Sequence, residues 1–275
     1  MTKRPAAVRL VLALGLATIA LWTFPAVSQT KKYLPQPLKA SSLMGMRVED
    51  TDGHKIGTIR NLVLDTRSGT LRYAVIASGG VFGVDATLKL APANAMSAAT
   101  TKRATLAVNA TTTQWNRAPV FKRSKLDALA EPGAAQEVSR HFEPAPSHAG
   151  QSLSVTGNES GEHEPKPDLK FASDLMGMHV VNAQQERIGD VLNLLVGFAR
   201  SRPAFAIISS GRFFHHGPQF AVPLNALSAT GSNRQLMLNV DTAALQNAPA
   251  FNQQVWNSSL TNASPQVYSY QKPED

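Results

Sequence analysis

The chain repeats one short segment: Ser-Leu-Met-Gly-Met-Arg-Val at residues 42–48 returns as Asp-Leu-Met-Gly-Met-His-Val at residues 174–180. At the same offset of 132 residues, Ile56-Gly57 matches Ile188-Gly189 and Asn61-Leu62 matches Asn193-Leu194. With small deletions the match continues to Phe121 and Phe251. Solenoid repeats are typically 20–50 residues long, so two copies of roughly 100 residues indicate a duplicated domain.

Within each copy the pattern favours short β-strands. In the first copy we expect strands at 46–49, 56–64, 71–77, 87–91 and 104–109. Asp52-Gly53 favours a tight hairpin, and Gly57 indicates a bulge. Thr111 and Gln114 have capping-box spacing, and Asp241 can cap a matching helix in the second copy. Strands this short are best stabilised by closing into a barrel that hides the sheet edges.

Both copies resemble the PRC-barrel domains, a family named after the photosynthetic reaction centre H subunit. The shared features are Leu43-Met44-Gly45-Met46-x-Val48, Asp52-Gly53-x-x-Ile56-Gly57, the strand 73–76 and the turn 92–96. The second copy departs at its hairpin, where Gln184-Gln185 replaces Asp52-Gly53, so the type of that turn stays open. The resemblance implies an all-β protein with two tandem small barrels, short helices at the barrel ends and a flexible linker. It also implies assembly or partner binding, without a shared set of catalytic residues.

The first thirty residues have the organisation of a signal peptide. A positive start with Lys3, Arg4 and Arg9 precedes the apolar run 10–21, and Ala26-Val27-Ser28 is a small-residue cleavage site. We predict cleavage after Ser28 and a periplasmic protein, the alternative being an inner-membrane protein anchored by an uncleaved helix. The predicted regions are a signal peptide (1–28), an N-terminal extension (29–40), repeat 1 (41–144), a disordered linker (145–170) and repeat 2 with a C-terminal strap (171–275).

Charge divides the chain into two unlike halves. Residues 31–144 hold 16 Lys and Arg against 9 Asp and Glu, whereas residues 145–275 hold 8 against 10. At four positions an arginine of the first copy corresponds to an uncharged residue or to His179 in the second copy. These arginines are Arg47, Arg60, Arg67 and Arg72. These arginines predict a surface for an acidic envelope protein or for anionic membrane headgroups. Without stacking aromatic residues beside them, and in an exported protein, no nucleic-acid partner is expected.

The second copy carries apolar side chains in a loop of its own. Phe213 and Phe214 are candidates for contact with the first barrel or with a partner, next to His215 and His216. Adjacent side chains on an extended segment point to opposite faces, so the two histidines are poor joint ligands for a metal ion. A metal-dependent periplasmic factor using these histidines and the His-bearing linker remains the alternative function.

Nothing in the sequence has the spacing of a catalytic motif. The chain has no cysteine, which excludes thiol catalysis and thiolate metal sites. It also lacks a nucleophile elbow, a phosphate-binding glycine loop and a dinucleotide fingerprint. An eight-stranded barrel is about the smallest that can enclose a ligand, so no small-molecule substrate is expected. We predict a non-catalytic envelope binding or scaffold protein without a cofactor.

Overall fold

The computed structural model describes residues 38–79, 86–98, 105–131, 133–142, 166–198, 204–210, 218–230, 234–239 and 251. Within these ranges the chain is mostly β-strand, with a few short helices. None of the described helices has the length and apolar character that a membrane crossing requires.

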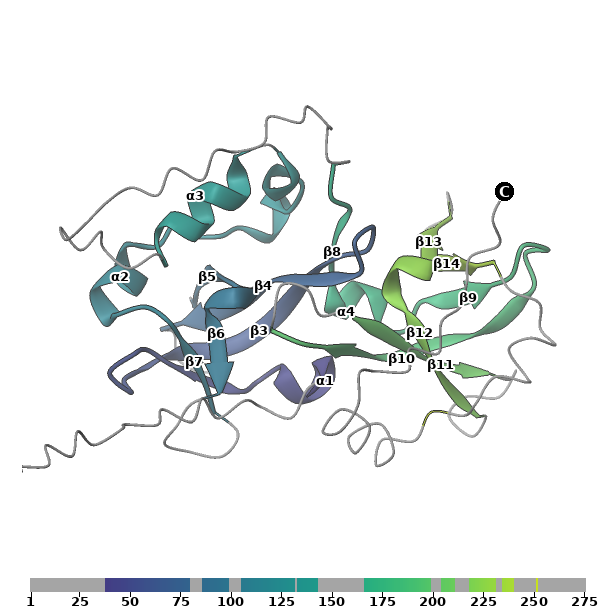
Figure 1. Ribbon diagram of the computed structural model, residues 1–275, viewed down its shortest axis with the longest axis horizontal. Helices are drawn as coiled ribbons and strands as arrows, with labels where there is room; N and C mark the ends of the chain where they lie inside the picture. The colour runs from purple at the N-terminus through teal and green to yellow at the C-terminus, as the bar shows by residue number, and fades with distance from the viewer. Residues whose placement is uncertain are drawn as a thin grey trace, which may run out of the picture. The chain divides into compact units, whose positions relative to one another are not determined.

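The first repeat forms one curled sheet of six strands (Figure 1). Its strands are β2 (Arg47–Glu49), β3 (Lys55–Asp65), β4 (Thr70–Ser78), β5 (Thr87–Pro92), β6 (Met96–Ala98) and β7 (Thr105–Val108). They lie in the order β5-β4-β3-β2-β7-β6, with β2 and β7 parallel and all other neighbours antiparallel. The two ends of this order follow each other in the chain, because the 3₁₀ turn η1 (Ala93–Ala95) joins β5 to β6.

The second repeat builds the same sheet. Its strands are β9 (His179–Val181), β10 (Arg187–Val196), β11 (Phe205–Ser210), β12 (Gln219–Pro223), β13 (Leu227–Ala229) and β14 (Gln235–Leu238). The order β12-β11-β10-β9-β14-β13 matches that of the first repeat, and the turn η4 (Leu224–Ala226) joins β12 to β13. β9 and β14 are the parallel pair. The all-β architecture with two tandem barrel domains is therefore confirmed.

Each sheet gains a seventh strand from the other repeat. Strand β1 (Leu38–Lys39) precedes the first repeat but pairs with β10 of the second. Strand β8 (Leu169–Phe171) precedes the second repeat but pairs with β3 of the first. We call β1 and β8 the arm strands. Each leads into a single helical turn, α1 (Ala40–Leu43) or α4 (Ala172–Leu175), whose leucine is buried.

Matching hydrogen bonds hold the two exchanged segments. The Asn61 Nδ2 donates to Ser173 Oγ over 2.8 Å, and Asn193 Nδ2 donates to Ser41 Oγ over 2.6 Å. In each pair the backbone N–H of the serine donates back to the asparagine Oδ1. One buried apolar cluster runs through both repeats, so the exchange also joins their cores.

The segment after β7 covers part of the first sheet. It contains α2 (Thr112–Arg117), η2 (Arg123–Lys125), η3 (Asp127–Ala130) and α3 (Ala134–Arg140). Within this segment Trp115 on α2, Val138 on α3 and Phe142 are buried. The capping box of Thr111 and Gln114 is present as predicted. The corresponding helix after Asp241 and the C-terminal strap lie outside the described residues.

Local backbone rules explain the repeated glycines. A Cβ at Gly57 would lie 2.3 Å from the Ala77 carbonyl oxygen, and one at Gly189 would lie 2.3 Å from that of Ser209. The pairing of β2 with β3 shifts register beside Gly57, as the predicted bulge requires. The hairpin glycine Gly53 has φ +82°. Its counterpart Gln185 takes φ +64° without being glycine, so both hairpins turn alike.

Candidate functional site

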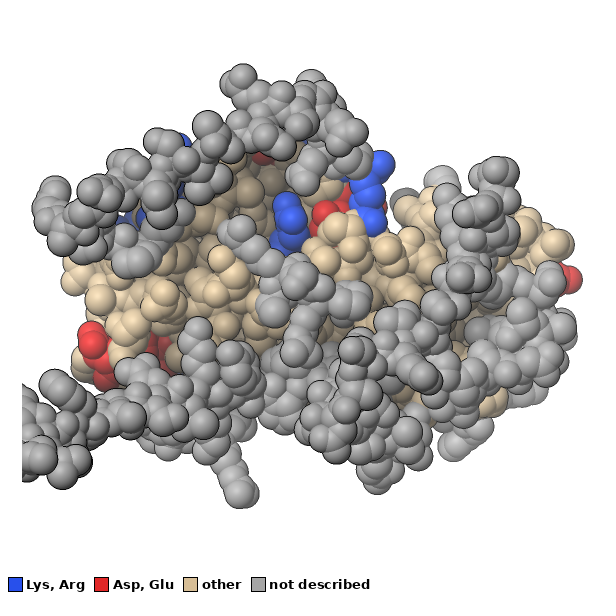
Figure 2. All heavy atoms as spheres, in the orientation of Figure 1, with Lys and Arg blue, Asp and Glu red and all other residues tan. Residues whose placement is uncertain are grey.

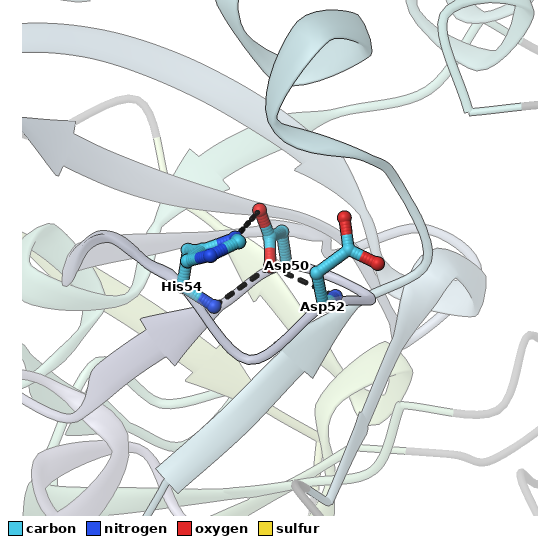
Figure 3. Close-up of side chains that lie close together, drawn as sticks. All are labelled: Asp50, Asp52 and His54. Atoms are coloured by element: carbon cyan, nitrogen blue, oxygen red, sulfur yellow. Dashed lines mark hydrogen bonds and ion pairs between the residues drawn. The ribbon is translucent and has the colours of Figure 1, made fainter.

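The first candidate site is the hairpin between β2 and β3, where Asp50, Asp52 and His54 come together (Figure 3). One ligand atom from each lies within 4.8 Å of the others. Asp50 is buried, and its Oδ1 accepts the backbone N–H groups of Asp52 and His54 over 2.9 and 2.8 Å. Its Oδ2 accepts the Thr112 hydroxyl and lies 3.4 Å from His54 Nδ1.

These contacts give the Asp50 carboxylate a structural task. Burial alone would raise the pKa of Asp50, but hydrogen bonds from Thr112 and from the two backbone N–H groups lower it below its ordinary value. In the second repeat Asn182 takes the same place, and its Oδ1 accepts the backbone N–H groups of Gln184 and Glu186. Because a neutral amide builds the same turn, the cluster is explained as hairpin support rather than as a metal centre.

The second candidate site is a pocket of about 310 Å³. It lies where the first sheet meets arm strand β8 and the segment after α2. The pocket is lined by Arg60, Asn61, Val75, Leu88, Phe121, Arg123, Phe171 and Ser173. Its wall therefore contains residues from both repeats, and it depends on the strand exchange.

Apolar groups and two guanidinium groups share this pocket. The rings of Phe121 and Phe171 are 6.3 Å apart between centroids and tilted by 59°. Arg123 stacks on Phe171 with its Cζ 4.3 Å from the ring centroid, and it also forms an ion pair with Asp174. Arg60 is exposed, and no hydrogen bond or ion pair to another described residue holds it. One of the two cations is thus open to a ligand.

The four predicted partner-binding arginines occupy different parts of the first repeat. Arg47 on β2 lies opposite Thr58 and donates through Nε to the buried Glu49 over 2.8 Å. Arg67 is exposed in the turn that follows β3, and the end of that strand at Asp65 lies seven residues, or roughly 23 Å, from Thr58. Arg72 is half-buried on β4. Arg60 lies on β3, between Thr58 and the turn that carries Arg67. The face in Figure 2 likewise shows basic side chains beside acidic ones near its middle.

Acidic side chains bind arm strand β8 to the turn that carries Arg67. Asp168 Oδ2 accepts the Thr66 hydroxyl over 2.5 Å, and its Oδ1 lies 2.9 Å from Lys170 Nζ. Burial would raise the pKa of Asp168, but the hydrogen bonds from Thr66 and Lys170 lower it. The buried Asp65 accepts the Asp168 backbone N–H. The Asp65 and Asp168 carboxylates are thus occupied by contacts that hold the fold together, and neither residue lines the pocket of the described chain.

One buried cation also has a structural explanation. Lys89 Nζ donates to the backbone carbonyls of Trp115 and Asn116, both over 2.8 Å, at the end of α2. Burial lowers the pKa of Lys89. A cation is favourable at a helix C-terminus, so Lys89 fastens α2 to β5.

Sequence reasoning and structure overlap only in part at these sites. Arg60 was singled out and lines the pocket, whereas Phe213, Phe214, His215 and His216 lie outside the described residues. The hairpin cluster was missed, although its alternating Asp-x-Asp-x-His spacing could have indicated it. No sequence signal pointed to the pocket, because Phe121 and Phe171 come from different repeats.

These two curled sheets, each completed by an arm of the other, define a duplicated small β-barrel protein. Residues 37–111 and 167–245, more than half of the chain, each match the PRC-barrel domain. The chain therefore belongs to the PRC-barrel family and carries two of its domains. Domains of this family are typically non-catalytic. No curated protein matches the chain at a significant level.

Proposed function

We propose that this protein is a non-catalytic binding module of the bacterial cell envelope. In this proposal it is exported, cleaved after Ser28, and contacts an acidic protein partner through exposed arginines of the first repeat. The family supports a binding role, and the signal-like N-terminus supports export. Arg60 and Arg67 are the residues that we propose for the contact.

The observation that carries the proposal is the position of Arg60. The β3–β4 pairing shifts register between Ile59 and Asn61, so Arg60 is the extra residue of a bulge. The β10–β11 pairing shifts between Val191 and Asn193 in the same way, and Leu192 takes the equivalent place. Since the bulge forms with either side chain, the cation at Arg60 is not needed for the fold. An exposed guanidinium in that situation is available for a partner.

The chemistry of such a contact fits an acidic surface. Arginine donates two parallel hydrogen bonds to one carboxylate, which gives both geometry and strength. Exposed charges at an interface rim mainly raise the association rate and set specificity. We therefore expect binding that weakens as ionic strength rises.

The proposal is tested by capture from a periplasmic extract with the mature chain as bait. The double variant Arg60→Glu and Arg67→Glu reverses two exposed cations while leaving the Arg47–Glu49 pair intact. Lys55→Glu with Lys125→Glu is the matched control, because it changes the net charge equally at exposed positions of the same repeat. We expect the arginine variant to recover at least roughly fivefold less of a crosslinked acidic protein, with the control near wild type. Equal recovery by both variants would refute the proposal.

Two further measurements separate this function from its alternatives. Vesicles containing phosphatidylglycerol test whether the same arginines bind a membrane surface, in which case wild type but not the double variant cosediments with them. A metal assay on the tag-free mature protein tests for tight stoichiometric zinc or copper, which would favour a metal-dependent factor. N-terminal sequencing of the periplasmic fraction tests cleavage after Ser28.

A further inference from the structure

We propose that the pocket beside arm strand β8 is a binding site for a small carboxylate with an apolar body, such as an arylalkyl or short-chain acyl acid. This site goes beyond the protein contact proposed above. The volume of about 310 Å³ lies at the lower end of the range for small-molecule pockets. Phe121 and Phe171, from outside the six strands of the first sheet, form part of its wall, so the pocket is not enclosed by those six strands alone.

The apolar part of the ligand is set by four side chains. Val75, Leu88, Phe121 and Phe171 line the pocket, and the two phenylalanine rings lie against each other at a tilt of 59°. Leu88 is half-buried, and the backbone N–H of Phe121 donates to the Leu88 carbonyl oxygen over 2.7 Å, which fixes the two against each other. A preformed wall of this kind receives an aromatic ring or a short acyl chain without first having to order.

The charged part of the ligand is set by Arg60 and Arg123. Asp174 neutralises one of these cations through its ion pair with Arg123, so the two guanidinium groups and one carboxylate leave a net positive charge at the pocket. Arg60, which has no partner in the part of the chain that the structure describes, supplies the donor for an added anion. A planar carboxylate matches the fork of a guanidinium group.

The polar residues of the pocket do not compete for that anion. Asn61 and Ser173 bond to each other in both directions, and the Ser173 hydroxyl also donates to Asp174. Their hydrogen-bonding capacity is largely used within the protein. Selectivity for an acid over an amine therefore depends on the guanidinium groups.

A bound ligand would touch both repeats. Arg60, Val75 and Leu88 belong to the first sheet, while Phe171 belongs to the arm strand of the second repeat. A ligand that binds only the paired arrangement stabilises that arrangement by mass action. Binding should therefore raise the unfolding temperature of the full chain.

The test is a calorimetric titration of the mature chain with 3-phenylpropionate and with octanoate, each compared with its amine counterpart, 2-phenylethylamine or octylamine. We expect saturable binding of the acids with a dissociation constant of about 1 mM or tighter, and at least roughly tenfold weaker binding of the amines. Failure of both acids to saturate at about 20 mM, or equal binding of the amines, would overturn the proposal.

Variants assign the binding to this pocket. Arg60→Gln removes the open cation and should weaken acid binding roughly tenfold, which is the size expected for one charge-assisted hydrogen bond. Leu192→Gln changes the equivalent bulge of the second repeat and should leave binding unchanged. Leu88→Trp fills the pocket without changing its charge and should abolish binding of both acids. If the variants without ligand unfold at the same temperature as wild type, they are folded. Unchanged binding in Arg60→Gln and Leu88→Trp would then place the ligand elsewhere.

Arg60 belongs to both the pocket and the proposed protein contact, so Arg67 and Leu88 are the positions that distinguish the two. Arg67 is in the β3–β4 turn and does not line the pocket. Arg67→Glu should therefore reduce partner capture while leaving acid binding intact. Loss of acid binding with normal partner capture in Leu88→Trp would separate the two functions from the other side.

Discussion

At the bulge of its longest strand the first repeat carries Arg60 and the second carries Leu192, yet both repeats keep an asparagine at the next position. In each case the asparagine Oδ1 accepts the following backbone N–H and reaches the serine of the other repeat's arm. The comparison separates two kinds of residue. The asparagine is required for the contact with the exchanged arm, whereas the residue before it is free to vary and can serve in binding.

The two hairpins give the same lesson with different chemistry. Asp50 and Gly53 form the first hairpin, and Asn182 and Gln185 form the second. A side-chain oxygen that accepts two backbone N–H groups is common to both, while charge and glycine are not. The hairpin thus depends on an acceptor at one position and on a left-handed backbone at another.

The largest loss of stability is expected at the two equivalent glycines where neither repeat has room for a Cβ atom. Gly57→Ala and Gly189→Ala each place a methyl group 2.3 Å from a backbone carbonyl oxygen, which cannot move without disturbing the sheet. We expect each variant to lose about 3 kcal/mol or more of unfolding free energy, measured by urea denaturation. Gly45→Ala, where no atom lies within 4 Å but φ is +88°, is the control for strain alone and should lose less.

Removing the two asparagine–serine contacts of the strand exchange should lower the unfolding free energy by different amounts. Asn61 is buried and Asn193 is half-buried, so Asn61→Ala leaves the buried N–H of Leu62 without its partner and Asn193→Ala leaves a more accessible one. We expect losses of about 2 and about 1 kcal/mol of unfolding free energy, in that order. Ser173→Ala and Ser41→Ala should follow the same ranking with smaller losses. A reversed ranking would contradict the assignment of the first contact as the more buried one.

The hairpins can be made alike by one substitution. Gln185→Gly relieves a non-glycine residue of its left-handed conformation and should raise the unfolding free energy by about 1 kcal/mol. The reciprocal variant Gly53→Gln should lower it by a similar amount. Differential scanning calorimetry of both variants checks the sign, and a decrease for Gln185→Gly would show that its side chain makes a compensating contact.

The smallest effect concerns acid. The pKa values of Asp50 and Asp168 are lowered in the folded protein. Each carboxylate therefore stabilises the fold at pH values above its ordinary pKa of 3.8 and loses that contribution as the pH falls below about 4. Asp50→Asn copies the amide of Asn182 and should change stability at pH 7 by less than about 1 kcal/mol. Between pH 4 and pH 2 its stability should fall less steeply than that of wild type. An unchanged acid slope, followed by circular dichroism, would show that Asp50 titrates alike in both states.

Much of the fold follows from local rules that the sequence displays. The alternating strand at 71–77, the glycine beside the bulge and the capping box at Thr111 all depend on neighbours within a few residues. The same rules left the second hairpin open, because Gln184-Gln185 has no turn signature. There the tertiary contacts of Asn182 impose a turn that the local sequence does not favour.

The strand exchange could not be predicted for a different reason. Arm strands of two or three residues have almost no pattern of their own. Because the repeats are alike, each arm would meet nearly the same strand edge in its own repeat as in the other. The choice depends on distances that only the folded chain defines, and for the same reason the pocket that uses Phe171 could not be predicted.

The exchange of arms has a mechanical consequence. Residues 143–165 connect the two repeats covalently, and each repeat also contributes one arm strand to the sheet of the other. A protease cut in that connection would yield two fragments that still migrate together as one particle under native conditions. Pulling them apart would require unzipping both arms, so a load applied to one half is transmitted to the other through the sheets themselves.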